Sequence, residues 1–140
     1  MMKSVLPLLL FFASVVSVHA EDAERYEVPN YKIGKIESFK VTNPSYRNGY
    51  DQTENCKRFH MTRTKGQFFI RHAKLISEFA TFHDYSFTSC SAKGSVKFVN
   101  GDDAVWVINH NGTASLTFKN GIFKDKLINL YCQRCDDMDM

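Results

Sequence analysis

The sequence predicts an α+β fold, in which a mainly antiparallel β-meander sheet is covered by one or two short helices. Three Asn-Gly pairs give the clearest evidence: Asn100-Gly101, Asn111-Gly112 and Asn120-Gly121. Both residue types tolerate positive φ, and the tight turn that results matches the twist of paired strands. Strand-like runs flank these turns at residues 95–99, 104–110, 113–119 and 122–131. Apolar residues alternate cleanly in two of these runs, 95–99 and 113–119, and together the runs predict a four-strand meander with one buried face.

A helix is predicted over residues 65–74. Thr62 or Thr64 can cap its N-terminus. Apolar or aromatic residues then recur at helical spacing, with most basic residues between them: Phe68, Phe69, His72, Ala73 and Ile76. We expect the face formed by Phe68, His72 and Ala73 to cover the buried face of the meander, since an open apolar sheet would otherwise meet water.

Three other segments complete the predicted architecture. Residues 31–42 indicate a strand with a bulge near Gly34, and residues 43–45 and 47–49 are rich in turn-forming residues. The aromatic-rich residues 78–90 are predicted to form a loop that leads into a further strand. Trp106 is the only tryptophan, and it alternates with Ala104 and Ile108. This pattern favours a core position over an exposed binding platform.

The first twenty residues have the pattern of a secretory signal peptide. Lys3 supplies positive charge, residues 5–16 are apolar, and Val18-His19-Ala20 is a small-x-small cleavage site before Glu21. A retained membrane anchor is the alternative, but the apolar run is shorter than the ~20 residues that a spanning helix needs. We therefore expect a periplasmic or secreted protein, with no transmembrane segment after cleavage. Its predicted parts are a loose polar N-terminus (residues 21–30), one α+β domain (31–135) and an acidic tail (136–140).

The charge of the domain suggests an acidic partner. Residues 28–135 carry sixteen Lys and Arg against eight Asp and Glu. Such an excess favours an acidic protein or an anionic envelope polymer as a partner, although ordinary solubility is the simpler explanation of the charge. The basic residues are scattered along the sequence and do not form a run. Nucleic acid is therefore not an expected partner of an exported protein.

Four cysteines in an exported chain predict disulfide bonds. Three pairings are possible, and we favour Cys56–Cys90 with Cys132–Cys135. The first bond would close a loop of about 34 residues, which is long enough to restrict the unfolded chain substantially. The competing arrangements join Cys90 to Cys132 or to Cys135 and leave Cys56 to the remaining sulfur.

The Cys132-x-x-Cys135 spacing is also used by thiol-redox proteins and metal sites. Redox function needs a stabilised thiolate, and the neighbouring Asp136 and Asp137 would instead raise a thiol pKa. A structural zinc site needs two more ligands, and no second tightly spaced pair is present in the sequence. A structural disulfide is the preferred interpretation, and no metal or cofactor site is predicted.

His72, His83 and Asp84 form the best candidate catalytic group. A histidine that is oriented by an aspartate can act as a general base. The possible nucleophiles are Ser86, Ser89 and Ser91, and none of them lies in a Gly-x-Ser-x-Gly elbow. A loop whose polar groups satisfy the backbone is the simpler interpretation of the same residues.

The order of several residues between about 55 and 135 resembles a group of small exported proteins of proteobacteria that have no assigned function. The matching residues are Cys56, Phe59, Phe68, Phe69, His72, Ala73, Lys74, His83, Asp84, Tyr85, Cys90, Gly94, Ala104, Trp106, Ile108, Gly112, Ala114, Leu116, Tyr131, Cys132 and Cys135. The resemblance implies a bacterial periplasmic or secreted setting and implies no activity.

The predicted function is therefore a non-catalytic binding or inhibitor-type module that acts through its surface. The alternative is a small envelope enzyme or thiol-redox protein that uses Cys132 and Cys135, or His72, His83 and Asp84.

Overall fold

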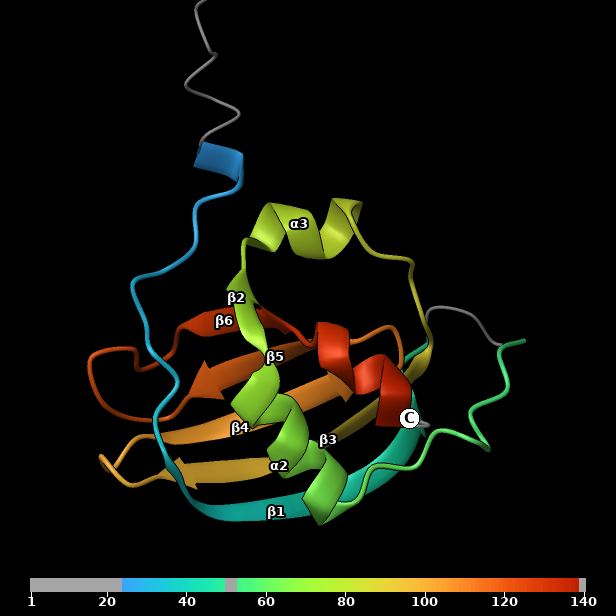
Figure 1. Cartoon of the computed structure of the whole chain (residues 1–140), viewed down its shortest axis with the longest axis horizontal. Helices are drawn as coiled ribbons and strands as arrows, with labels where there is room; N and C mark the ends of the chain where they lie inside the picture. The colour runs from blue at the N-terminus through green and yellow to red at the C-terminus, as the bar shows by residue number, and fades with distance from the viewer. Residues whose placement is uncertain (1–23, 50–52, 139–140) are drawn as a thin grey trace, which may run out of the picture.

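The computed structural model describes residues 24–49 and 53–138, and the predicted signal peptide lies outside this range (Figure 1). The sheet has six antiparallel strands in the order β1-β3-β4-β5-β6-β2. The elements are β1 (Ile36–Arg47), α2 (Arg63–His72), β2 (Lys74–Ile76), α3 (Glu78–His83), β3 (Cys90–Phe98), β4 (Asp103–Asn109), β5 (Thr113–Phe118), β6 (Leu127–Tyr131) and the 3-10 helix η1 (Gln133–Met138). The α+β prediction is confirmed.

The meander β3–β6 follows the three Asn-Gly turns. Gly101, Gly112 and Gly121 have φ values of 95°, 86° and 75°, which is the left-handed region that such turns require. The strands predicted at 104–110 and 113–119 match β4 and β5 closely, whereas β3 begins at Cys90, five residues before the predicted start. The fourth strand was predicted from residue 122 but β6 begins at Leu127, because residues 121–126 belong to a turn in which Ile122 is 89% exposed.

The core lies on one face of this meander, with Trp106 at its centre. Trp106 is fully buried, as predicted, and its indole nitrogen donates a hydrogen bond to the Ser95 carbonyl at 3.1 Å. Its ring stacks on Phe39 of β1, with 4.9 Å between ring centroids. Gly94 lies beneath the indole, where a Cβ would be 1.9 Å from the Lys40 carbonyl oxygen and 2.4 Å from the indole ring. The large Trp106 side chain therefore fits because Gly94, its partner on the neighbouring strand, has no side chain.

Helix α2 covers this core, but with a different face from the predicted one. Thr62 caps the helix by accepting a hydrogen bond from the Lys65 amide at 3.2 Å. The buried residues are Gly66, Phe69 and Ile70, whereas His72 is exposed and Phe68 is only partly buried. Gly66 explains the rotation, because a Cβ there would be 2.5 Å from the Phe39 ring. The helix approaches β1 through this glycine, which brings the residues three and four positions later onto the core.

Strand β1 also differs from its prediction. It begins after Gly34 and continues through residues 43–45, which were expected to form a turn. Its pairing with β3 shifts register between Ile36 and Ser38, and at two places between Val41 and Tyr46. Pro44 is tolerated because β1 lies at the edge of the sheet, where no strand needs its missing N–H. The turn-forming residues therefore make the pairing of β1 with β3 irregular, but they do not reverse the chain.

The predicted loop at residues 78–90 contains the short helix α3. Ser77 caps it by accepting a hydrogen bond from the Ala80 amide at 3.0 Å. Among the residues of α3 only Ala80 is buried, because the helix lies beyond the β2 edge of the sheet (Figure 1). Segment 84–89 then leads into β3, so the predicted further strand and the strand predicted at 95–99 are one and the same.

Both favoured disulfides are present. Cys56 and Cys90 are joined with a Cα–Cα distance of 5.3 Å, and Cys132 and Cys135 with one of 5.4 Å. The first bond connects the segment before α2 to the start of β3. The second closes a small ring between the end of β6 and η1. Two disulfides are compatible with an oxidising, exported location.

Candidate functional site

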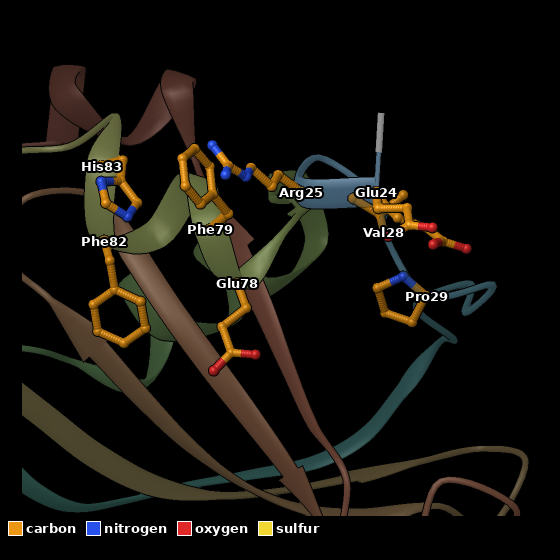
Figure 2. Close-up of a pocket in the computed structure, with 9 residues that line it drawn as sticks. Glu24, Arg25, Val28, Pro29, Glu78, Phe79, Phe82 and His83 are labelled. Carbon is orange, nitrogen blue, oxygen red and sulfur yellow. The ribbon is translucent and has the colours of Figure 1, made fainter. Parts of the chain in front are cut away.

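The largest of the described cavities is an open cleft of about 630 Å³ between residues 24–29 and helix α3 (Figure 2). Its lining residues are Glu24, Arg25, Glu27, Val28, Pro29, Glu78, Phe79, Phe82 and His83. His83, which the sequence suggested as a catalytic base, is therefore at the surface of a cleft. The lining contains three carboxylates, so the cleft is more acidic than the rest of the domain.

Phe79 organises this cleft. The Arg25 guanidinium carbon lies 5.4 Å from its ring centroid, and the Tyr26 ring meets it edge-on at 5.3 Å. The His83 imidazole stacks on the same ring with a centroid distance of 4.0 Å, one helical turn along α3. Figure 2 shows Phe79 between the Arg25 and His83 side chains. These contacts attach the N-terminal segment to α3 by aromatic and cation–π packing.

The predicted catalytic group is not assembled. Asp84 follows α3 and accepts a hydrogen bond from the Tyr26 hydroxyl at 3.4 Å, so its carboxylate does not orient His83. His72 lies on α2, where its ring stacks on Phe68 at 4.0 Å and its Nδ1 is 3.3 Å from the Phe68 carbonyl oxygen. His72 therefore ends α2, His83 ends α3 and Asp84 directly follows α3, and the described interactions include no side-chain contact among the three.

The candidate nucleophiles have structural partners. The Ser91 hydroxyl is buried, donates to Asn109 Oδ1 at 2.7 Å and accepts from Asn48 Nδ2 at 3.0 Å. Ser89 is buried and its amide donates to a Glu54 carboxylate oxygen. Ser86 is exposed, and its carbonyl accepts a hydrogen bond from Asn111. Ser91 thus belongs to an asparagine network and not to a histidine pair.

The Cys132–Cys135 disulfide is fully buried. Both cysteines have no exposed surface, and the Cys132 amide donates to the Gly112 carbonyl at 3.0 Å. Thiol–disulfide exchange requires that an attacking thiolate reach a sulfur atom. In this position the sulfurs form part of the core beneath α2 and are not presented to a partner.

Glu54 is a structural residue that the sequence did not suggest. One of its oxygens accepts from the Thr88 hydroxyl at 2.7 Å and lies 3.8 Å from His110 Nδ1. Glu54, Cys90 and His110 have potential ligand atoms within 4.8 Å of one another. The Cys90 sulfur is already bonded to Cys56, so it cannot act as a thiolate ligand. The group therefore holds segment 54–56 against β3.

Basic residues lie on α2 and in the segments directly before and after it. Residues 57–74 contain six Lys or Arg and no Asp or Glu: Lys57, Arg58, Arg63, Lys65, Arg71 and Lys74. All are exposed except Lys65, which is half-buried. The intervening apolar residues Phe59, Met61, Phe69 and Ile70 are buried and direct the basic ones outward. We call these six residues the basic face, which the sequence concealed because apolar anchors separate its members.

Three tyrosines have raised pKa values. Burial, with a smaller contribution from the Asp102 charge, raises the pKa of Tyr31 to about 12. Burial raises the pKa of Tyr46, although a hydrogen bond with Ser91 opposes the shift. Burial also raises the pKa of Tyr85. All three phenols therefore stay protonated at neutral pH, and none is activated as a base or nucleophile.

Comparisons with known proteins identify no relative. No family model, no curated protein and no solved structure matches this chain. Within residues 24–49 and 53–138, no helix is long and apolar enough to cross a membrane.

Proposed function

We propose that this protein is an exported, non-catalytic binding module that engages an acidic protein or an anionic envelope polymer through the basic face. The observation that carries this proposal is the acid-free segment 57–74, which presents six cationic side chains around one helix. The segment itself contains no Asp or Glu. A surface of this kind attracts anionic partners over several ångströms and accelerates their association.

The scaffold holds the basic face in a defined arrangement. The Cys56–Cys90 bond lies immediately before the segment, and at its end Lys74 pairs with Tyr131 in the sheet. Between these points Phe59 and Phe69 are buried anchors. A surface that is ordered before binding loses less conformational entropy when a partner arrives. Rigid placement of the cations therefore supports a binding role.

The enzyme and thiol-redox alternatives have weaker support. His72 and His83 are each stacked on a phenylalanine of their own helix, and Asp84 bonds to Tyr26. The Cys132–Cys135 sulfurs are buried. The exported setting rests on the predicted signal peptide, the two disulfides and the resemblance to small exported proteobacterial proteins.

The test is a charge reversal on α2 with a matched control. The exported protein is titrated with poly-L-glutamate, and with polyphosphate as a non-peptide polyanion. The Arg63→Glu/Arg71→Glu variant should weaken binding by about tenfold or more, because charge pairing at this surface becomes repulsion. The control is Lys119→Glu/Lys124→Glu, which makes the same change in net charge at two exposed residues beyond β5.

The control should change affinity less than about threefold, and binding of the unmodified protein should weaken as salt is raised. Equal losses of affinity in the two double variants would show that net charge, and not the basic face, determines binding. The absence of saturable binding to either polyanion would overturn the proposal.

A further inference from the structure

A second and uncharged hollow lies on the face of the sheet opposite α2. It has a volume of about 290 Å³ and is lined by Asn48, Thr81, Phe82, Phe87, Thr88, Asn109, Asn111 and Thr113. Asn109 alternates in β4 with the buried Ile108, which places the asparagine on the opposite face from the core. We call this hollow the asparagine groove, after Asn48, Asn109 and Asn111.

Four polar residues of the groove, Asn48, Asn109, Asn111 and Thr113, form one continuous hydrogen-bonded chain through the neighbouring Ser91. Asn48 Nδ2 donates to Ser91 Oγ at 3.0 Å, and that hydroxyl donates to Asn109 Oδ1 at 2.7 Å. Asn109 Nδ2 donates to Thr113 Oγ1 at 3.0 Å, which donates to Asn111 Oδ1 at 2.7 Å. Each hydroxyl and amide thus fixes the orientation of its neighbour, so the groove is ordered before any ligand arrives.

This chain leaves hydrogen-bonding capacity for a ligand. An amide nitrogen carries two hydrogens. Within the described residues Asn109 Nδ2 donates one of them, to Thr113, and Asn111 Nδ2 donates one, to the Ser86 carbonyl. Both side chains line the groove. One N–H of each asparagine is therefore available to a carbonyl or hydroxyl oxygen.

Two aromatic rings border these polar groups. Phe82 of α3 is 57% exposed and Phe87 of the following segment is 56% exposed. Large apolar side chains that converge at a concave polar surface usually mark a binding site. Phe82 also lines an adjacent hollow of about 240 Å³, which shares Thr81 and Asn109 with the groove. The two hollows together can hold two neighbouring ring-sized units.

The lining decides the chemical class of the ligand. None of the eight residues of the groove carries a charge, so an ionic ligand would lose its hydration without gaining a counter-charge. Sugar rings present an apolar face that packs on aromatic rings and hydroxyls at their edge, and acetamido groups pair well with side-chain amides. We propose that the asparagine groove binds a neutral oligosaccharide that carries acetamido groups.

The probe is tri-N-acetylchitotriose, titrated into the exported protein and followed by calorimetry. We expect saturable binding with a dissociation constant in the millimolar range or tighter. Phe82→Ala should weaken it at least about fivefold, and Phe82→Tyr should retain most of it, because the ring face remains. Ile122→Ala is the matched control at an exposed apolar residue outside the groove, and it should leave binding unchanged.

The proposal is independent of the basic face, so the Arg63→Glu/Arg71→Glu variant should bind the sugar normally. Equal weakening by Phe82→Ala and Ile122→Ala would overturn it. Binding of an uncharged peptide such as N-acetyl-trialanine amide in place of the sugar would assign the groove to peptides instead. No saturation by either probe would also overturn it.

Discussion

Helices α2 and α3 are close in sequence and begin in the same way, but they differ in how much of their surface is buried. Both are short, and each begins at a hydroxyl N-cap, Thr62 or Ser77. Helix α2 buries Phe69 and Ile70 completely in the core. Helix α3 buries only Ala80 and leaves Phe82 mostly exposed.

The two helices therefore differ in what they contribute: α2 packs on the core, whereas α3 borders surface cavities. Helix α2 closes the core, and its fully exposed residues are polar or cationic. Residues of α3 line each of five surface cavities in the described chain, which range from about 240 to 630 Å³. A helix with little buried surface is easily displaced, and hollows persist around it. The described cavities therefore gather at α3, whereas the proposed anionic partner would contact the basic face at α2.

The largest expected effect comes from replacing one phenylalanine on each helix. Phe69→Ala should lower the free energy of unfolding by about 3–5 kcal/mol, because the ring is fully buried. Phe82→Ala should lower it by less than about 0.5 kcal/mol, because most of the ring is in water. Urea titration of both variants measures the two values. Similar losses in both would show that α3 contributes as much to the core as α2.

The disulfides provide the second test. Breaking Cys56–Cys90 with the double serine variant should cost about 3–4 kcal/mol, because the bond closes a loop of 34 residues and anchors the segment before α2. The corresponding change at Cys132 and Cys135 opens a much shorter ring, so its entropic cost is about 1–2 kcal/mol. Thermal unfolding of both variants shows which disulfide contributes more to stability. A larger loss at the short ring would mean that core packing outweighs loop closure there.

The two N-caps sharpen the comparison further. Thr62→Ala should lower global stability by about 1 kcal/mol, because α2 unfolds together with the core. Ser77→Ala removes an equivalent bond but should act locally, since α3 can open while the sheet remains folded. Hydrogen exchange would then be faster at the α3 amides alone. If Ser77→Ala instead lowers global stability by the full amount, α3 belongs to the cooperative core.

The smallest expected effect concerns Tyr31, which anchors the segment that connects residues 24–29 at α3 to β1. Its ring contacts Phe118 and Phe123, and its hydroxyl is buried without a hydrogen-bond partner in the described structure. The folded-state pKa of about 12 exceeds the ordinary value of 10.0. Folding therefore favours the neutral phenol, and this stabilisation is complete below pH 10 and is lost as the pH rises towards 12.

Tyr31→Phe should thus remove part of the alkaline loss of stability between pH 10 and 12, as chemical denaturation at several pH values would measure. At pH 7 the variant should be within ~1 kcal/mol of the original protein, because the missing hydroxyl had no partner. An unchanged alkaline transition would assign that loss to other groups.

The meander was predictable because its signals are local. Each Asn-Gly pair specifies its own turn, and alternation identified Trp106 as a core residue. The disulfides followed from the position of each cysteine at the border of a recognisable segment. Helix α3 was missed because six residues with a serine cap give too short a periodic pattern to distinguish from a loop.

The remaining errors concern contacts between distant segments. The rotation of α2 depends on the fit between Gly66 and Phe39, and the bounds of β1 depend on its pairing with β3. The asparagine groove could not be predicted for the same reason. Asn109 and Asn111 are neighbours at the β4–β5 turn, whereas Asn48 follows β1, and only the strand register brings Asn48 to them through Ser91.

The irregular course of β1 has a consequence for the protein in concentrated solution. An open sheet has two outer strands whose free N–H and C=O groups can pair with another chain and start aggregation. Here β2 is only three residues long, and β1 is interrupted by Pro44 and by its shifts of register. The Met61 amide also donates to the Pro44 carbonyl at 2.8 Å, which occupies part of the outer edge. Neither border offers a long, flat template, so the sheet is guarded against growth by strand addition.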